Sequence, residues 1–407
     1  MAPKKSSRAP SNRFLARTKL PHPLRVYQQE GVRFFAHNMS ALLADEMGLG
    51  KTVQTILAVR YLAAKNPGQR ALVVAPRSLC RNWALEFSPW APNLLVRIVE
   101  GNARNRQAMY HLPIPVLIAT YEQMRLDTDL LDRTSPFDIV VLDEAQRIKD
   151  QNSGTSIACR GIPRARSWAL TGTPIENHLE DLMSLFSFVQ RQLLFRGIPV
   201  GELHARIKPY FLRRTKADVL PELPPILIQD LALTLRGKQL AAYESLWQSR
   251  SRFAPRLGKP VSQTGLLALI TKLKQACNYD PDSGESVKLE ALNVILENLS
   301  QPTDKAIVFS QYVQTLQWLS SRLDGMPCKL FHGALSAQER DDAVGWFRQE
   351  PQPCVLLVSI KAGGVGLNLQ EASTVVLFDR WWNPAVENQA IQRAHRFGRQ
   401  RPLHVFR

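Results

Sequence analysis

Two stretches of the chain alternate short apolar runs with amphipathic segments, a pattern that predicts α/β structure with parallel strands. The candidate strands of the first stretch are Ala41–Ala44, Ala71–Ala75, Val116–Thr120, Ile139–Leu142 and Trp168–Leu170. Those of the second are Ala306–Phe309, Leu330–His332, Val355–Ser359, Val375–Asp379 and Leu403–Arg407, with helices expected near 311–323, 336–348 and 384–396. Uninterrupted apolar runs are typical of strands that helices cover on both faces.

Residues 178–290 show no further strand pattern. Leu179–Gln190 and Gly265–Ala276 have helical patterns, and Pro221, Pro224 and Pro225 interrupt the chain. The pattern therefore predicts four segments: a basic arm over 1–22, a first lobe over 23–190, helical insertions and a linker over 191–290, and a second lobe over 291–407.

Charge points to a polyanionic partner. The 407 residues include 52 Lys and Arg against 35 Asp and Glu, a net charge of +17. A basic protein without such a partner remains an alternative on charge alone. No apolar run approaches the roughly 20 residues that a membrane span needs, which argues against a membrane protein.

The cysteines indicate the redox compartment of the protein, and the N-terminal residues indicate a basic arm. Five scattered cysteines show neither paired metal-ligand spacing nor a disulfide framework, so a reducing compartment is expected. Basic residues precede the first acid, Glu30, and predict a disordered arm that either touches DNA or addresses the chain to a nucleus.

The segment Asp45–Thr52, between a candidate strand and a candidate helix, predicts a phosphate-binding loop. Gly48 and Gly50 allow backbone amides to wrap phosphates at the start of a helix. Lys51 would neutralise the β- and γ-phosphates, and Thr52 would hold Mg²⁺. The loop departs from the general P-loop pattern because Asp45 stands where the first glycine is usual.

Two further clusters complete the predicted ATP chemistry. Asp143 and Glu144 end an apolar strand, where Asp143 would orient Mg²⁺ and Glu144 would polarise the attacking water. Arg393 and Arg396, three residues apart on an expected helix, would face one way as arginine fingers. Gln28 offers an amide that suits adenine, and the turn Thr171–Pro174 could sense the phosphate.

At this point the sequence resembles the SWI/SNF-type ATPases of helicase superfamily two. Arg213 and Arg214 belong to the most family-specific segment. Ten segments match in order: Leu24–Gln28, Asp45–Thr52, Val74–Ser78, Asp143–Gln146, Leu170–Asn177, Phe211–Thr215, Ile307–Gln311, Ser359–Leu369, Trp382–Pro384 and Gln389–Gly398. The resemblance implies two RecA-like parallel-sheet lobes with helical insertions between them, closing on ATP.

The resemblance also implies roles for individual residues. The catalytic residues are Lys51, Asp143, Glu144, Arg393 and Arg396, and the Mg²⁺ ligands are Thr52 and Asp143. The remaining ATP-binding residues are Gln28, Asp45, Glu46, Met47, Gly48, Leu49, Gly50, Gln146 and Gly366. The nucleic-acid-binding residues are Pro76, Arg77, Ser78, Thr120, Ser310, Gln311, His332, Gly333, Ser359, Lys361, Gly363 and Gly364.

The sequence departs from the family pattern in three places. Gln146 replaces the histidine of many eukaryotic members and indicates the bacterial and archaeal branch. Arg399 stands where glutamine is usual. The chain stops after Leu403–Arg407, before the brace that follows in family members, so we expect a fragment with weakened activity.

The prediction is an ATP-dependent translocase on double-stranded DNA that displaces a DNA-bound protein. It would contact the DNA backbone without sequence preference, act as a monomer, and work in a prokaryotic nucleoid, or in the nucleus of a eukaryote. A strand-separating DNA or RNA helicase and a catalytically inactive scaffold are the alternatives.

Overall fold

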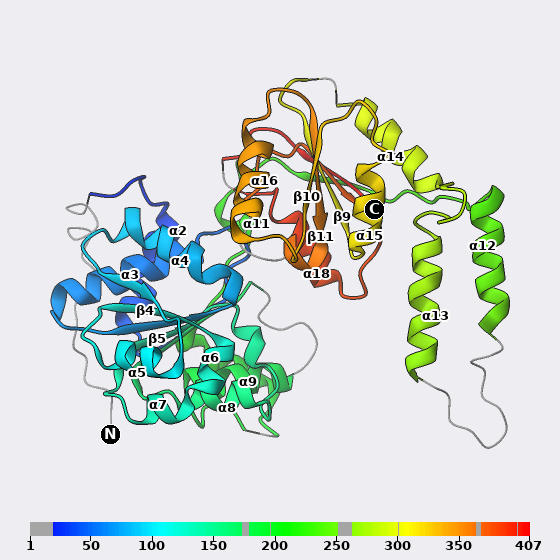
Figure 1. Ribbon diagram of the computed structural model, residues 1–407. Coiled ribbons are helices and arrows are strands. Elements are labelled where there is room, and N and C mark those ends of the chain that lie inside the picture. Colours follow the sequence, from blue (N-terminus) through cyan, green and yellow to red (C-terminus); the bar gives the residue numbers. More distant parts are fainter. Residues whose placement is uncertain are drawn as a thin grey trace, which may run out of the picture. The chain divides into compact units, whose positions relative to one another are not determined.

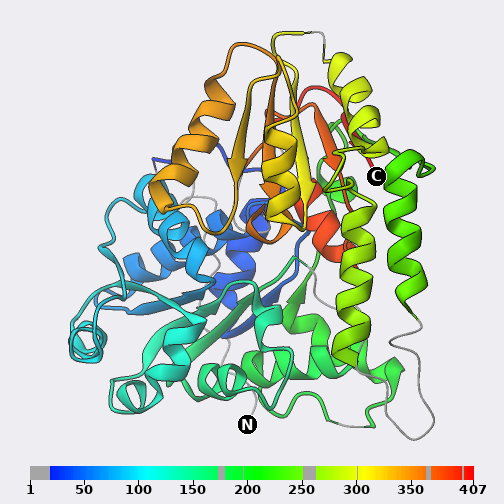
Figure 2. The same cartoon turned by 45° about the vertical axis from the view of Figure 1, so that its right-hand side comes forward.

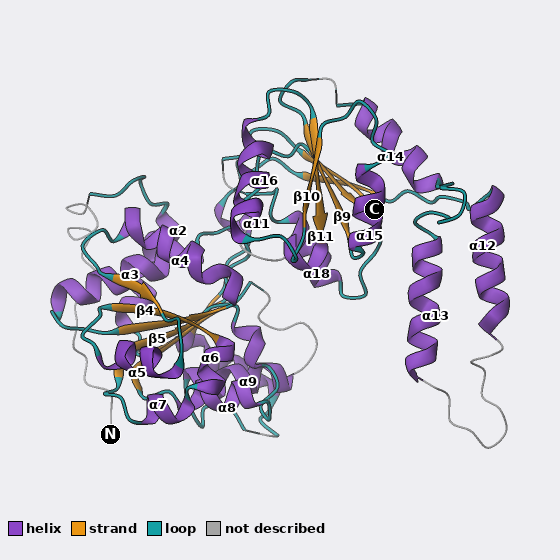
Figure 3. Cartoon of the chain, in the orientation of Figure 1, coloured by secondary structure: helices purple, strands orange, loops and turns teal. Residues whose placement is uncertain are grey.

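The computed structural model describes residues 19–172, 179–195, 197–250, 263–299, 301–363, 368–396 and 398–407. The chain divides into two compact units, residues 1–221 and residues 222–407, here called lobe 1 and lobe 2. Figure 3 shows a sheet with helices packed around it in each lobe, which confirms the predicted α/β class with two parallel sheets.

The described strands of lobe 1 form one parallel sheet in the order β3-β4-β2-β5-β6-β1-β7. Its strands are β1 (Ser40–Leu43), β2 (Ala71–Ala75), β3 (Val96–Ile98), β4 (Val116–Thr120), β5 (Phe137–Leu142), β6 (Arg164–Leu170) and β7 (Phe211–Leu212). Because every pair is parallel, the carboxyl ends of all these strands lie along one edge of the sheet.

Helices cover both faces of this sheet. The helices are α2 (Val26–His37), α3 (Lys51–Lys65), α4 (Arg77–Trp90), α5 (Ala103–His111), α6 (Tyr121–Leu126), α7 (Thr128–Asp132), α8 (Gly154–Gly161), α9 (Leu179–Val189), α10 (Val200–Ile207) and α11 (Lys216–Val219), with 3₁₀ turns η1 (Ala145–Ile148) and η2 (Lys208–Tyr210). Figure 1 shows α2, α3 and α4 on one side of the strands and α6, α8 and α9 on the other.

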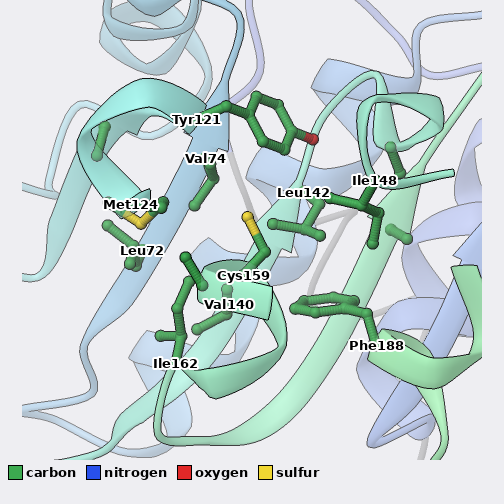
Figure 4. Packing of buried hydrophobic residues seen from close by; sticks show 14 of the residues in the cluster. Leu72, Val74, Tyr121, Met124, Val140, Leu142, Ile148, Cys159, Ile162 and Phe188 are labelled. Atoms are coloured by element: carbon green, nitrogen blue, oxygen red, sulfur yellow. The ribbon is translucent and has the colours of Figure 1, made fainter. Parts of the chain in front are cut away.

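Successive side chains of each strand point to opposite faces of the sheet, so apolar side chains of the strands pack against the helices on both faces. On one face, Val74 and Leu142 pack with Met124, Cys159 and Phe188 from the helices (Figure 4). On the other face, the ring of Trp168 lies 4.7 Å from that of Phe35 in α2. Burying a large apolar side chain completely contributes about 1.5–3 kcal/mol, so both layers stabilise the sheet.

Lobe 2 contains a second parallel sheet, in the order β10-β11-β9-β12-β13-β8 among the described residues. Its strands are β8 (Ile226–Gln229), β9 (Lys305–Ser310), β10 (Cys328–Phe331), β11 (Cys354–Ser359), β12 (Thr374–Leu377) and β13 (Leu403–Phe406). The last of these strands lies inside the sheet, between β12 and β8.

Helices also pack on both faces of the lobe 2 sheet. The helices of this lobe are α12 (Gly237–Gln248), α13 (Gln263–Ala276), α14 (Val287–Glu297), α15 (Val313–Ser320), α16 (Ala337–Gln349), α17 (Ile360–Gly363) and α18 (Pro384–Ile391). Phe309 faces a cluster with α16 and α18, whereas its neighbour Val308 faces α14 and α15. Figures 1 and 2 both show α12 and α13 side by side at the margin of this lobe.

The expectation that no strands occur between residues 178 and 290 is wrong. Phe211–Leu212 forms β7 and pairs with β1, and Ile226–Gln229 forms β8 and pairs with β13. Both strands lie at sheet edges, and Leu227 and Ile228 are about half exposed, so neither has the surroundings of a fully buried strand. The prolines at 221, 224 and 225 lie between these two strands, and the last of them directly precedes β8.

Candidate active site

The predicted chemistry gathers at the carboxyl edge of the lobe 1 sheet, where parallel α/β sheets bind their ligands. The loop after β1 carries Asp45–Gly50, the loop after β5 carries Asp143–Gln146, and Thr171 follows β6. The predicted nucleic-acid-binding residues of this lobe follow β2 and β4. Since β2 lies between β4 and β5, the two sets of loops adjoin.

The loop after β1 has the geometry of a phosphate cradle. Gly48 and Gly50 have φ of 87° and 75°, a left-handed conformation that favours glycine, and Gly50 directly precedes helix α3. The Lys51 ammonium donates to the carbonyls of Asp45 (2.7 Å) and Glu46 (3.4 Å). A Cβ at Gly50 would lie 2.7 Å from Nε2 of Gln28, so that amide borders the loop. These features suit an anion at a helix N-terminus.

The side chain of Asp45 points into the protein. Its carboxylate is fully buried and accepts two hydrogen bonds from Arg214, from Nε to Oδ1 at 3.0 Å and from Nη2 to Oδ2 at 2.5 Å. Gln54 donates to the same carboxylate at 3.3 Å. Of the groups of Asp45, only the backbone is therefore placed to meet a nucleotide. This carboxylate supports the base of the loop where the general pattern has glycine.

Arg214 joins several elements around that base. Its guanidinium also donates to Oε1 of Gln54 (2.9 Å) and to the carbonyl of Tyr27, whereas the neighbouring Arg213 is exposed. Glu46 accepts a hydrogen bond from the backbone N–H of Lys216 at 2.7 Å. The segment after β7 thus fixes the base of the phosphate loop through hydrogen bonds to Asp45 and Glu46.

Asp143 is a second buried acid of the site. Its carboxylate accepts hydrogen bonds from Nε1 of Trp83 (2.7 Å) and from the backbone N–H of Glu144 (3.0 Å). Burial, together with the Glu144 carboxylate, raises the pKa of Asp143, and the Trp83 N–H and the Lys51 ammonium oppose the rise. A cation at this carboxylate would be favoured for the same reason.

Glu144 is held in a fixed direction. Its backbone adopts φ 51° and ψ 52°, a left-handed conformation that costs a non-glycine residue roughly 1–2 kcal/mol. Oε2 accepts a hydrogen bond from Nε2 of Gln146 at 2.7 Å, and Oε1 of Gln146 accepts one from the Thr171 hydroxyl at 2.9 Å. A Cβ at Gly172 would lie 2.6 Å from Met47. The turn after β6 therefore contacts both Gln146 and the phosphate loop.

Replacing Gln146 by alanine should lower the rate of ATP hydrolysis about tenfold at unchanged ATP affinity, because Glu144 would lose a hydrogen bond that aims its carboxylate. Steady-state kinetics separates the two quantities. Gln146→His keeps a ring N–H as donor and should retain most of the rate. Equal losses in the alanine and histidine variants would contradict this role.

The donor set fits Mg²⁺. Asp143 offers a carboxylate whose two oxygens are already oriented by N–H donors, and Thr52 offers a hydroxyl in the first turn of α3. Hard oxygen ligands of this kind, few in number and next to a phosphate cradle, are those that Mg²⁺ uses with nucleotides.

The predicted nucleic-acid-binding residues of lobe 1 lie at helix starts. Pro76 is the N-cap of α4, and Arg77 and Ser78 are exposed in its first turn. Thr120 is the N-cap of α6, and its hydroxyl accepts a hydrogen bond from the N–H of Gln123 at 3.1 Å. Exposed N–H groups and cations at helix N-termini suit phosphate oxygens.

In lobe 2 the predicted residues differ in their access to solvent. Ser310 is buried, and its hydroxyl donates to Asp379, which also accepts from the N–H of Gln311 at 3.0 Å. Ser359 is buried as well. His332 and Gln311 are partly exposed, and Gly333 and Lys361 are exposed. Gly363 ends α17, while Gly364 and Gly366 lie outside the described residues.

The expected helix over 384–396 is shorter, and the placement of the two arginines on it is wrong. Helix α18 ends at Ile391. The N–H groups of Arg393 and Ala394 bond three residues back instead of four, and the carbonyl of Arg393 accepts from Leu369. Arg393 and Arg396 therefore follow the helix in a tight turn, where Arg393 is only 6% exposed.

Arg399, which departs from the family pattern, is partly buried among the loops of lobe 2. Within the described residues, its guanidinium donates to the backbone carbonyls of Gln370, Ala372, Ala394, Arg401 and Pro402. Burial lowers the pKa of Arg399 to about 10, which leaves it charged at neutral pH. This side chain fastens the turn with Arg393 to the loops on either side.

Comparison with known proteins identifies the family of the chain. A family model described as the SNF2-related domain matches residues 27–196 and 199–282, and the helicase conserved C-terminal domain matches residues 287–398. Over 94% of the chain, the sequence is 36% identical to an "Uncharacterized ATP-dependent helicase" of Mycoplasma pneumoniae and 34% identical to the "Putative ATP-dependent helicase/translocase YwqA" of Bacillus subtilis. It spans 40% and 46% of their lengths, less than half of each.

A solved structure shares the architecture. The Sulfolobus solfataricus SWI2/SNF2 ATPase core in complex with dsDNA is 31% identical, with a TM-score of 0.50, covering 95% of this chain and 88% of that one. The SNF2-related model alone matches more than half of the chain, and the phosphate loop, the Asp143–Glu144 pair and the Arg213–Arg214 segment lie within it. The chain therefore belongs to the SWI/SNF-type ATPase family of helicase superfamily two.

Proposed function

We propose that the chain hydrolyses ATP and uses the energy to translocate along double-stranded DNA, displacing proteins bound there. The observation that carries the proposal is that the predicted ATP-binding and nucleic-acid-binding residues of lobe 1 lie along the same edge of its sheet. There the phosphate loop, Asp143 and the Thr171–Gln146–Glu144 hydrogen bonds adjoin the exposed Arg77 and Ser78. The solved structure of a relative with dsDNA supports duplex DNA as the polymer.

The residues divide the chemistry among them. The backbone amides from Gly48 to Lys51 would bind the phosphates of ATP, and the Lys51 ammonium would turn from the loop carbonyls to the β- and γ-phosphates. Glu144, aimed by Gln146, would orient the attacking water and take its proton. Mg²⁺ held by Thr52 and Asp143 would supply positive charge for the phosphate oxygens. Arg393 and Arg396 of lobe 2 would serve as arginine fingers.

Contacts to DNA would be independent of sequence. The exposed candidate groups are cations, hydroxyls and backbone amides, which recognise phosphate and not base edges. Together with the +17 charge they predict binding that weakens steeply with salt. We further propose that the motor is a monomer and works in the nucleoid of a prokaryotic cytoplasm. Among the described residues, no helix is both long and apolar enough to span a bilayer.

The test is ATP hydrolysis without nucleic acid and with duplex DNA, single-stranded DNA or RNA at one stated salt concentration, with Lys51→Ala as the blank. We expect duplex DNA to stimulate best, and triplex displacement then tests movement. Stronger stimulation by single strands or RNA would favour a strand-separating helicase. Binding of DNA with no hydrolysis under any condition would indicate an inactive scaffold.

A further inference from the structure

Helix α4 connects the predicted nucleic-acid contact to the predicted metal ligand. Its first turn carries the exposed Arg77 and Ser78, and Trp83 lies six residues after Arg77, about 9 Å along the helix at 1.5 Å per residue. The Trp83 side chain is 1% exposed, and its indole N–H donates to Oδ2 of Asp143 at 2.7 Å. One rigid element therefore reaches both places.

A second contact comes from the other candidate segment. Tyr121 directly follows Thr120, is buried, and donates its hydroxyl hydrogen to the backbone carbonyl of Asp143 at 2.6 Å. Figure 4 shows Tyr121 at the edge of the apolar cluster, beside Val74. The N–H of Asp143 donates to the carbonyl of Val74 at 2.8 Å. Asp143 is thus bonded by the segments that follow both β2 and β4.

Burial of an indole does not by itself explain the choice of partner. A buried tryptophan N–H needs an acceptor, and Trp168, which is fully buried in the same lobe, uses the backbone carbonyl of Asn38 at 3.1 Å. Trp83 instead donates to a carboxylate, and hydrogen bonds to charged acceptors are shorter and roughly twice as strong. The contact of Trp83 constrains a side chain that acts in the site.

We propose that Trp83 is a positioning residue that orients the Asp143 carboxylate for Mg²⁺. When nucleic acid binds at the start of α4, Trp83 would change the orientation of that carboxylate. The inference rests on the proposed function, because it takes Arg77 and Ser78 as nucleic-acid contacts. A helix that shifts on binding carries its indole with it, and a hydrogen bond weakens steeply as its geometry changes. Tyr121 would hold the backbone of Asp143 during such a shift.

The first test measures metal-dependent binding and not turnover. Trp83→Phe keeps an aromatic ring and removes the N–H, and Trp168→Phe is the matched control with the same loss at a backbone acceptor. Binding of a fluorescent ADP analogue is titrated with Mg²⁺. We expect the Mg²⁺ midpoint to rise about tenfold in Trp83→Phe and by less than twofold in Trp168→Phe. Equal midpoints in the two variants would overturn the positioning role.

The second test measures transmission. The ratio of hydrolysis rates with and without saturating duplex DNA should fall at least about fivefold in Trp83→Phe at an unchanged Kd for DNA, since a lost hydrogen bond of ordinary strength is worth about that factor. An unchanged ratio beside a stimulated wild type would overturn transmission alone. A wild type that duplex DNA fails to stimulate would overturn the proposed function as well. If Trp83→Phe does not fold, Tyr121→Phe should shift both readouts in the same direction.

Discussion

Replacing Arg214 by alanine is expected to lower the stability of lobe 1 by about 3–5 kcal/mol, because the carboxylate of Asp45 would stay buried without its partner. The effect should concentrate in β1 and the phosphate loop, which Arg214 and Gln54 hold together. Hydrogen exchange followed by mass spectrometry on lobe 1 peptides measures the local free energy of opening.

Arg213→Ala is the matched control, one residue away and exposed, and should change stability by less than about 0.5 kcal/mol. Arg214→Lys should recover only part of the loss, since an ammonium cannot make the bidentate contact. Similar protection in the two alanine variants would refute the ion pair as a support of the loop. Asp45→Asn combined with Arg214→Ala should cost less than the sum of the single losses.

Replacing Glu144 by glutamine should lower ATP turnover by about 10²–10⁴-fold, since the amide cannot take the proton of the attacking water. ATP binding should persist, because the phosphate loop and Lys51 are unchanged. Turnover is measured with saturating duplex DNA, and binding with a fluorescent ATP analogue. Loss of binding in parallel with turnover would show that Glu144 acts in holding the nucleotide and not in its hydrolysis.

Glu122→Gln supplies the control for that experiment. Glu122 is an exposed acid on α6 that pairs with Arg147 at 3.3 Å, so the same substitution removes a carboxylate of the same lobe that is not one of the predicted site residues. Exposed ion pairs contribute little, and this variant should hydrolyse ATP at close to the rate of the unaltered chain.

The order of the strands in each sheet could not be read from local patterns, but most of the strands themselves could. The runs at Ala71–Ala75 and Val116–Thr120 were predicted at their observed bounds, because strands buried on both faces are continuously apolar. The edge strands β3, β7 and β8 were missed, since β3 and β7 are only three and two residues long and β8 is half exposed. Their place depends on neighbours far away in sequence.

The site shows the same division. Gly48, Gly50 and Lys51 form a cradle that local spacing predicts, because the φ angles of a tight turn and a helix start are local properties. The partner of Asp45 lies 169 residues away, and that of Trp83 lies 60 away, so no spacing rule could find either contact. The one sequence signal for the contact of Asp45 was an acid at the position where the general P-loop pattern has its first glycine. The donor role of Trp83 had no signal beyond its type.

The bonds of Arg399 have a consequence for how this part of the chain can vary. Every bond of its guanidinium that the structure shows ends on a backbone carbonyl, which any residue supplies. Gln370, Arg401 and Pro402 are therefore open to substitution in evolution or in design, provided that their backbone path is kept. Ala372 and Ala394 are constrained for another reason, since both are buried in the apolar core of lobe 2. A library that randomised positions 370, 399, 401 and 402 together should return arginine at 399 and diversity at the other three.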